Sequence, residues 1–402
     1  MRIFLHDYGG YAFTAQLAAG LANTGHSVFY SYSISTQGMK RFSLQNPVDN
    51  LTIEGIRLPQ RFDRYRLDRY RYMHRQQYET MHGKLVGKQI MRFQPDVVLS
   101  ANAPLDSQRM IQTASRRVGA GFIYWMQDCV ASAMHTELEH RIPMIGGLIG
   151  NFYINLERRM VSSSQALILA SEQFTANLAS QVSAAVPTTT IDNWAPLAEL
   201  PVLSKNNAWS RSHGLADKFV FLYTGVLGLK HNGRYFISLA EAFRSQTDVR
   251  VVVVAEGRLA ETLKMQAVSL GLQNLIILPY QPVDDYAQML AAADVLVTVL
   301  NQPAGRYSIP SKVYGYMCAA RPQLLSIDSE HSISKLIEEY GMGLVSSPDD
   351  VAGWISHADR LYQNQLLRQQ MGERARAYAE EKFDIDAIVN RFLSVINRVV
   401  EG

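Results

Sequence analysis

The sequence predicts an α/β protein made of two doubly wound, parallel-sheet domains. Short apolar segments typical of buried strands alternate with helical patterns along the 402 residues, and this alternation restarts after a proline-containing stretch at residues 193–201. A chain of this length is also long for one hydrophobic core. We therefore expect a Rossmann-like N-terminal domain over residues 1–197, a Rossmann-like C-terminal domain over residues 198–382, and a cleft between them.

Composition argues against several classes of protein. A formal net charge of only +3 gives no support to a nucleic-acid-binding protein. Cys129 and Cys318 lie far apart and match no zinc-type spacing, so the sequence predicts neither a disulfide nor a metal site. No run of 18 apolar residues occurs, and residues 2–7 are too strand-like for a signal peptide, so we expect a cytoplasmic protein.

In the N-terminal half, the apolar segments predict a parallel sheet whose first turn contains glycine. The expected strands are residues 2–7, 27–32, 51–56, 95–101, 121–128, 166–171 and 188–193. Gly9 and Gly10 separate the first strand from a helix at residues 12–23, and glycine lets a backbone approach a ligand or a facing domain closely.

Asp128 ends one of these strands and therefore lies at the ligand-binding edge of the predicted sheet. Its carboxylate can act as a base, orient a substrate hydroxyl or cap the following turn, and the sequence does not choose among these roles. We expect His135, seven residues later, to be structural.

Two stretches have the composition of a membrane-contacting surface. Arginines alternate with tyrosines and phenylalanine in residues 57–75, which suits an anionic membrane or a phosphorylated acceptor as well as it suits a solvated loop. Residues 141–160 predict a strongly apolar helix, for which burial is the favoured interpretation and contact with lipid the alternative. Peripheral contact with the inner face of a membrane is thus an open expectation.

The C-terminal half predicts a second sheet, with a glycine-rich turn after its first strand. The expected strands are residues 219–224, 251–255, 275–280, 294–300, 323–328 and 343–346. The turn at residues 225–233 contains Gly225, Gly228 and Lys230, a combination typical of an anion-binding turn.

A second candidate anion site follows the predicted strand at residues 294–300. Pro310 suits the first turn of a short helix, and Pro322 indicates where that helix has ended. Ser308, Ser311 and Lys312 then lie near its N-terminus, where unpaired N–H groups and the helix dipole favour a diphosphate. An ordinary crossover with a surface lysine is the alternative.

The chain ends in two predicted helices, at residues 373–381 and 386–400, with Asp384 as the N-cap of the second. Asp384-Ile385-Asp386 has the form of a metal-binding Asp-x-Asp motif, but it begins a helix with no strand before it. Capping is therefore the favoured role.

Taken together, these segments resemble the GT-B glycosyltransferases of family 4, and most closely the bacterial surface-polysaccharide enzymes of the colanic-acid fucosyltransferase type. The segments that carry the resemblance are residues 126–128, 193–194, 224–232, 256–257, 308–322 and 381–384. The resemblance implies two facing domains with a helix at residues 383–402 that crosses back. It also implies a retaining, metal-independent transfer of sugar from a GDP- or UDP-linked donor, without a further cofactor, to a glycan or lipid-linked acceptor held by the N-terminal domain.

The resemblance also implies roles for individual residues. Lys230 and Lys312 would contact the diphosphate, and Asp128 would be the catalytic or acceptor-orienting group. The remaining donor-site positions implied by the resemblance are Gly10, Gly225, Gly228, Glu256, Tyr280, Ser308 and Ser311.

The sequence departs from the family pattern at three positions. Tyr307 and Gly315 stand where most members have two glutamates that contact the donor sugar and the ribose, and Val226 replaces a common arginine. Two other functions therefore stay open: a sugar-nucleotide epimerase of the same fold, and a non-catalytic protein that binds sugar nucleotides.

Overall fold

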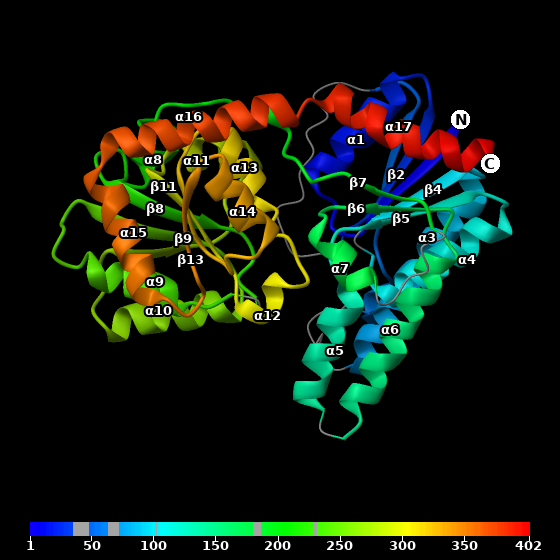
Figure 1. Ribbon diagram of the computed structural model, residues 1–402, viewed down its shortest axis with the longest axis horizontal. Coiled ribbons are helices and arrows are strands. Elements are labelled where there is room, and N and C mark those ends of the chain that lie inside the picture. The colour runs from blue at the N-terminus through cyan, green and yellow to red at the C-terminus, as the bar shows by residue number, and fades with distance from the viewer. Residues whose placement is uncertain (35–47, 63–71, 102, 143, 180–185, 229–230) are drawn as a thin grey trace. The chain divides into compact units, whose positions relative to one another are not determined.

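The computed structural model describes residues 1–34, 48–62, 72–101, 103–142, 144–179, 186–228 and 231–402 (Figure 1). The chain forms two compact units: residues 1–193 with 385–402, here called the N-terminal unit, and residues 194–384, here called the C-terminal unit. Each unit contains one parallel sheet covered by helices, which confirms the predicted pair of Rossmann-like domains.

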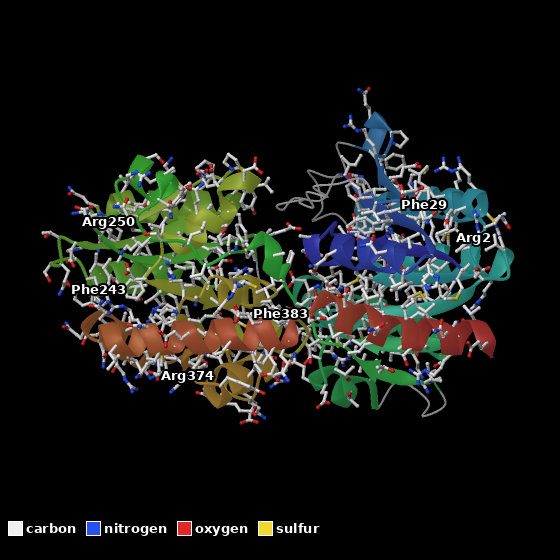
Figure 2. All side chains as sticks on the ribbon, turned by 90° about the horizontal axis from the view of Figure 1, so that it is seen from above. Arg2, Phe29, Phe243, Arg250, Arg374 and Phe383 are labelled. Atoms are coloured by element: carbon white, nitrogen blue, oxygen red, sulfur yellow. The ribbon has the colours of Figure 1, made fainter. Side chains whose placement is uncertain are left out.

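The sheet of the N-terminal unit has seven parallel strands in the order β3-β2-β1-β4-β5-β6-β7. Their bounds are β1 (Arg2–Asp7), β2 (Ser27–Ser33), β3 (Leu51–Ile56), β4 (Val97–Ala101), β5 (Gly121–Met126), β6 (Ala166–Leu169) and β7 (Thr188–Thr190). Helices cover both faces, so the central strands β1, β4 and β5 are buried along nearly their whole length rather than at alternate residues. Phe29 of β2, which is labelled in Figure 2, is an example. Its ring stacks on that of Phe4 with 5.2 Å between ring centres, and its centre lies 5.3 Å from that of the Phe93 ring.

The last helix of the chain completes the core of the N-terminal unit. Helix α17 (Ile385–Glu401) packs on α1 (Ala12–Asn23), where a Cβ at Gly20 would lie only 2.5 Å from Cγ2 of Val389. Phe392 packs edge-on against Trp125, with ring centres 4.8 Å apart. The final segment therefore returns to the first unit, as the resemblance implied. The other helical segments are η1 (Gln60–Phe62), α3 (Tyr72–Phe93), α4 (Leu105–Arg117), α5 (Val130–Arg141), α6 (Gly146–Ser162) and α7 (Gln173–Ala179).

The sheet of the C-terminal unit has six parallel strands in the order β10-β9-β8-β11-β12-β13. Their bounds are β8 (Phe219–Thr224), β9 (Val249–Val254), β10 (Leu275–Leu278), β11 (Val295–Val299), β12 (Gln323–Ser326) and β13 (Gly343–Ser346). The first strand of the unit, β8, lies in the middle of the sheet. From it the chain adds strands first on one side, through β9 to β10, and then on the other side, from β11 to β13. Doubly wound sheets bind ligands at this switch point, between β8 and β11.

Helices of the C-terminal unit alternate with its strands, as the sequence predicts. They are η2 (Leu197–Glu199), α8 (Ala208–Ser212), α9 (Arg234–Ala242), α10 (Arg258–Ser269), η3 (Val283–Asp285), α11 (Tyr286–Ala291), α12 (Gln302–Gly305), α13 (Lys312–Cys318), α14 (Ser332–Glu339), α15 (Val351–Gln363) and α16 (Gln365–Lys382). Helix α8 was not predicted; it begins with a capping box in which Asn207 and Ser210 exchange hydrogen bonds.

The predicted helix at residues 141–160 differs from the structure in extent and in burial. Helix α5 ends at Arg141 and α6 begins at Gly146, so this region is a helical hairpin (Figure 1). The expectation that its apolar side chains are buried is wrong for the first half of α6, because Leu148 and Phe152 are exposed. Its second half is anchored, since the Tyr153 hydroxyl donates to Oδ2 of Asp106 on α4 at 2.6 Å.

Candidate functional site

The predicted donor-site residues of the C-terminal unit lie beyond the ends of four neighbouring strands. Gly225 and Gly228 follow β8, Glu256 follows β9, Tyr280 follows β10, and Ser308, Ser311 and Lys312 follow β11. In the sheet order, β10, β9, β8 and β11 are consecutive, so these loops share one edge. This edge is where open α/β sheets bind ligands. Lys230 lies outside the described residues.

Lys312 places a buried positive charge at this edge. It is the first residue of α13, and its Nζ lies 3.5 Å from the centre of the Tyr223 ring on β8. The Nζ is buried and has no hydrogen-bond partner among the described residues. Burial without an anion disfavours the charged form, and it lowers the pKa of Lys312 well below its usual value. The aromatic face offsets only part of that cost, so an anionic ligand beside Nζ would be strongly stabilised.

Gly225 provides the space beside this ammonium group. A Cβ at Gly225 would lie 3.3 Å from Nζ and 3.4 Å from Cε of Lys312. Its φ of +131° is also in the range that favours glycine. The predicted pair of Gly225 and Lys312 is therefore brought together by β8 and β11, and any side chain at Gly225 would fill the space next to the charge.

The turn that follows Gly225 is held by its own hydrogen bonds. The Tyr223 hydroxyl donates to the carbonyl of Val226 at 3.0 Å, and the Gly228 N–H donates to Nδ1 of His231 at 3.1 Å. A Cβ at Gly228 would meet nothing within 4 Å, so packing does not require glycine there. His231 closes the turn, a role that was not predicted from the sequence.

Ser308 and Ser311 have different surroundings. Ser308 is buried, and its carbonyl lies 3.1 Å from Nε2 of His331, whose Nδ1 accepts from the Ile333 N–H at the start of α14. Burial lowers the pKa of His331, which favours the neutral ring that this arrangement needs. Ser311 is exposed at the N-cap position of α13, directly before Lys312. Only Ser311 thus stands at the open side of this turn.

Glu256 and Tyr280 are joined although 24 residues separate them. The Tyr280 N–H donates to Oε1 of Glu256 at 3.1 Å, which ties the turn after β9 to the loop after β10. The predicted nucleotide-side residues therefore form one connected rim at the edge of the sheet.

Gly315, which stands where the resemblance implies a glutamate, is closely packed by its neighbours. A Cβ at Gly315 would lie 3.2 Å from the hydroxyl oxygen of Tyr286 and 3.8 Å from Cδ1 of Leu200. Gly315 is buried on α13, so a longer side chain would have to displace Tyr286. Tyr307, at the other position where the resemblance implies a glutamate, is half-buried before this helix.

In the N-terminal unit, Asp7 organises the glycine turn that was predicted to approach the donor. Its carboxylate accepts hydrogen bonds from the N–H groups of Gly9 at 3.0 Å and Tyr11 at 2.7 Å, and from the Thr14 hydroxyl at 2.9 Å. Burial raises the pKa of Asp7 to about 6, and these hydrogen bonds oppose that rise. Gly10 has a φ of +67°. This role of Asp7 was missed from the sequence, although its position at the end of β1 was an available signal.

Asp128 lies just beyond β5, half-buried, at the same edge of the N-terminal sheet as the Gly10 turn. Its backbone carbonyl accepts from the Val130 N–H at 3.0 Å, at the start of α5. His135 lies inside the hairpin, where its ring blocks the space around Gly150, and its Nδ1 is 3.7 Å from Oε2 of Glu139. His135 therefore has the packing contacts of a structural residue.

Within the described ranges, no group of three or more histidine, cysteine, aspartate or glutamate side chains is arranged to hold a metal ion. Across the same part of the chain, no helix combines the length and apolar character needed to span a membrane.

Comparison with curated proteins finds relatives among glycosyltransferases. A probable glycosyltransferase, WbjE of Pseudomonas aeruginosa, is 24% identical over 190 residues, which is 47% of this chain and 47% of that protein. The α-D-kanosaminyltransferase of Streptomyces kanamyceticus is 21% identical over 188 residues, 46% of this chain and 47% of that protein. The matched region thus spans about half the length of these curated relatives.

Solved structures match the whole chain in fold. Sucrose-phosphate synthase from Thermosynechococcus elongatus has a TM-score of 0.71 at 13% identity and covers 99% of this chain and 98% of its own. HepE of Anabaena, in complex with UDP-glucose, has a TM-score of 0.71 at 15% identity and covers 99% of each chain. Residues 205–378, which lie within the C-terminal unit, match the family described as glycosyl transferases group 1. The chain therefore has the fold of the GT-B glycosyltransferases, and residues 205–378 of its C-terminal unit are similar to glycosyl transferases group 1.

Proposed function

We propose that this protein is a glycosyltransferase that moves a sugar from a nucleotide-diphosphate donor to a glycan or lipid-linked acceptor. The observation that carries the proposal is the buried ammonium of Lys312 beside Gly225, within the region matched by glycosyl transferases group 1. A buried cation without an anionic partner is unfavourable, and a diphosphate is a ligand that would satisfy it.

In this proposal the C-terminal unit acts on the leaving group. Breaking the bond between the sugar and the diphosphate leaves negative charge on the phosphate oxygen, and Lys312 stabilises that charge as it develops. Lys230 is proposed as the second cation, and Ser311 with the backbone of Gly225 and Gly228 as the lining of the site. Removing one donor of this kind costs on the order of 3 kcal/mol of transition-state stabilisation.

The finer assignments belong to the same proposal. The donor is GDP- or UDP-linked, and the UDP-glucose complex of HepE favours UDP as the first candidate. Transfer proceeds with retention and without a metal ion, Asp128 orients the acceptor or acts as base, and Gly10 lies by the donor. The reaction that we propose belongs to bacterial surface-polysaccharide synthesis, at acceptors that are held at the membrane.

Ligand binding tests the proposal without knowledge of the acceptor. Thermal unfolding of the full chain is measured with UDP, GDP and CMP, and a ligand at 100 times its dissociation constant raises the free energy of unfolding by about 2.7 kcal/mol. The expected result is stabilisation by one nucleoside diphosphate that is lost in Lys312→Ala and kept in Lys335→Ala, a control for an exposed lysine of the same unit. If the nucleoside diphosphate stabilised Lys312→Ala and Lys335→Ala equally, Lys312 would not be a ligand of the diphosphate and the proposal would lose its main support.

A second candidate is a non-catalytic protein that binds sugar nucleotides. It is favoured by one observation: a side chain at Gly315 would start 3.2 Å from the Tyr286 hydroxyl oxygen, so a glutamate there would require Tyr286 to move. Incubation with the stabilising sugar nucleotide and a panel of acceptors distinguishes the two functions, because only the transferase releases nucleoside diphosphate in an acceptor-dependent manner. Conversion of the donor sugar without any acceptor would instead indicate an epimerase.

A further inference from the structure

The α5–α6 hairpin of the N-terminal unit carries a group of exposed apolar side chains at its end. The two helices lie side by side and extend away from the sheet, joined at the far end by a short turn (Figure 1). Met144, Ile145, Leu148 and Phe152 follow one another from this turn along the first two turns of α6. We call these four residues the hairpin tip.

The exposure of the hairpin tip is unusually high for large apolar residues. Met144 is 97% exposed, Leu148 70%, Ile145 53% and Phe152 51%. Single exposed apolar residues are common on protein surfaces, but a contiguous group indicates a binding surface. Helix α5 packs on α6, and the four side chains stay exposed despite that contact, so this group is not the seam of the hairpin.

Charged residues continue the same helix at a distance that suits a lipid interface. Arg158 and Arg159 are exposed, and they lie six and seven residues beyond Phe152, which is about 10 Å along an α-helix. Asn155 is the exposed residue between Phe152 and the two arginines. Neither guanidinium group forms a hydrogen bond or ion pair with the described residues. The apolar side chains of the tip therefore match the acyl chains of a bilayer, and the two arginines beyond them match the lipid phosphates.

Size and charge favour a bilayer over a second protein molecule. A stable protein interface buries about 800 Å² on each partner, and four side chains at the end of a hairpin supply far less. A lipid surface deforms around a projecting end and needs no complementary groove. The exposed acids Glu137 and Glu139 belong to α5, which leaves α6 as the basic helix of the pair.

We propose that the hairpin tip inserts shallowly into an anionic lipid bilayer with α6 lying along the surface, so that Arg158 and Arg159 contact lipid phosphates. Insertion is a property of the N-terminal unit alone. Its purpose, bringing the enzyme to a lipid-linked acceptor, rests on the proposed glycosyltransferase function.

Co-sedimentation of the full chain with vesicles tests the apolar part of the proposal. Vesicles of phosphatidylcholine and phosphatidylglycerol are mixed with wild type, with Leu148→Ser/Phe152→Ser, and with Met265→Ser/Val268→Ser. The last is a matched control, because Met265 and Val268 are 66% and 78% exposed on α10 of the other unit. We expect about a tenfold or greater loss of vesicle binding for the tip variant and none for the control.

The basic part has its own variants. Arg158→Ser/Arg159→Ser is expected to weaken binding several-fold at low salt, and the difference from wild type shrinks as salt is added. Arg258→Ser/Lys264→Ser removes two exposed cations of α10 and is expected to bind as wild type does. Equal losses in both variants would assign binding to net charge and overturn the role of Arg158 and Arg159.

A fluorescent label locates the contact directly. The two native cysteines, Cys129 and Cys318, are buried, so a cysteine introduced at Leu148 can be labelled selectively with an environment-sensitive dye. Its emission is expected to rise and shift to shorter wavelength when anionic vesicles are added, whereas a dye on Val268→Cys stays unchanged. An unchanged signal at position 148 would overturn the insertion.

Two further outcomes also overturn the proposal. One is the absence of vesicle binding by the wild type. The other is a lipid-free dimer that the Leu148→Ser/Phe152→Ser variant dissociates in sedimentation velocity, which would assign the tip to a second copy of the chain. Circular dichroism of every variant establishes that the fold is intact. If vesicle binding holds while no donor supports transfer, the proposed function fails and the membrane contact stands.

Discussion

The ammonium group of Lys312 lies 3.5 Å from the centre of the Tyr223 ring, and the place where a Gly225 side chain would start lies 3.3 Å from the same nitrogen. Lys312 thus supplies the ammonium group, the Tyr223 ring packs against it, and Gly225 leaves space beside it. The three come from the loops and ends of two adjacent strands, β8 and β11. This arrangement gives the C-terminal unit a cation that is more stable with an anion than without one.

Replacing Lys312 by methionine is expected to increase stability and abolish nucleotide binding. Methionine fills a similar volume and removes an unpaired buried charge, so the free energy of unfolding should rise by about 1–2 kcal/mol in the absence of ligand. Chemical denaturation and isothermal titration with the preferred nucleoside diphosphate measure the two effects. A variant that is destabilised and still binds would show that the ammonium has a structural partner instead.

Binding of the diphosphate is expected to be linked to proton uptake. The pKa of Lys312 is lowered by burial when the site is empty, and a bound anion raises it again. At a pH between the pKa of Lys312 in the empty site and its pKa in the occupied site, the lysine takes up a proton when the diphosphate binds. The affinity for the diphosphate therefore increases as the pH falls through this range, by up to about tenfold per pH unit.

The proton uptake is measured by titration calorimetry in buffers of different ionisation enthalpy. Lys312→Met provides the correction for the titration of the phosphate itself. Proton uptake of the same size in the variant and the wild type would exclude Lys312 as its source.

Gly225→Ala is expected to lower both stability and nucleotide affinity. The new Cβ contacts Lys312, and the φ of +131° is strained for alanine, with a cost of about 1–3 kcal/mol. Gly214→Ala is the matched control, because Gly214 has a φ of +65° and an added Cβ there would meet no atom within 4 Å. Gly214→Ala is expected to lower the free energy of unfolding without lowering the affinity for the nucleotide. If both variants lost affinity to the same extent, the loss in Gly225→Ala would be an effect of global destabilisation.

Glu157 is expected to make the protein less stable as pH rises from about 4.5 to about 7. Its side chain is buried against the Tyr124 hydroxyl, and burial raises its pKa from 4.5 to about 7. The folded state therefore holds this proton more tightly than the unfolded state, and stability contributed by the protonated acid is lost across that range. The 2.5-unit difference corresponds to about 3 kcal/mol.

Chemical denaturation of Glu157→Gln and wild type across this pH range isolates the effect. Asp7 and His6, which are also buried, are present in both proteins, so their contributions are expected to cancel in the comparison. The variant should gain stability over wild type as pH rises, whereas Glu261→Gln, at an exposed position on α10, should not. A constant difference between variant and wild type would contradict the assignment.

Gly315→Ala is expected to destabilise the fold by about 1 kcal/mol, because the added methyl group approaches the Tyr286 hydroxyl to 3.2 Å. In a Tyr286→Phe background the oxygen is absent and the penalty should shrink. A double-mutant cycle by thermal unfolding measures this coupling. Additive effects would show that Tyr286 does not determine the identity of residue 315.

The shared edge of the donor site could be predicted from sequence because strand order and chain direction follow from the alternation of elements. Gly225 and Lys312 each follow an apolar run, and parallel strands bring their ends to one edge. The Tyr223 ring under the ammonium could not be predicted, since several aromatic residues surround the strand and none carries a local signal. His331 was missed for the same reason: its two ring contacts join segments that only the fold brings together.

The apolar residues of α6 illustrate a different limit. Their spacing predicts a helix equally well whether the apolar side faces a core or solvent, and burial was the more common outcome. Only the position of the hairpin relative to its sheet separates Leu148, which is exposed, from Tyr153, which is 1% exposed. Capping of α8 by Asn207 was missed because a five-residue helix has too few positions for a periodic pattern.

The return of α17 to the N-terminal unit has a consequence for biosynthesis. The C-terminal unit is contained in one continuous segment, whereas the N-terminal unit needs residues 385–402 to cover Trp125 and Gly121. During translation, the C-terminal unit can therefore finish folding before the N-terminal unit does. The N-terminal unit keeps an exposed apolar surface until α17 has left the ribosome and packs on it.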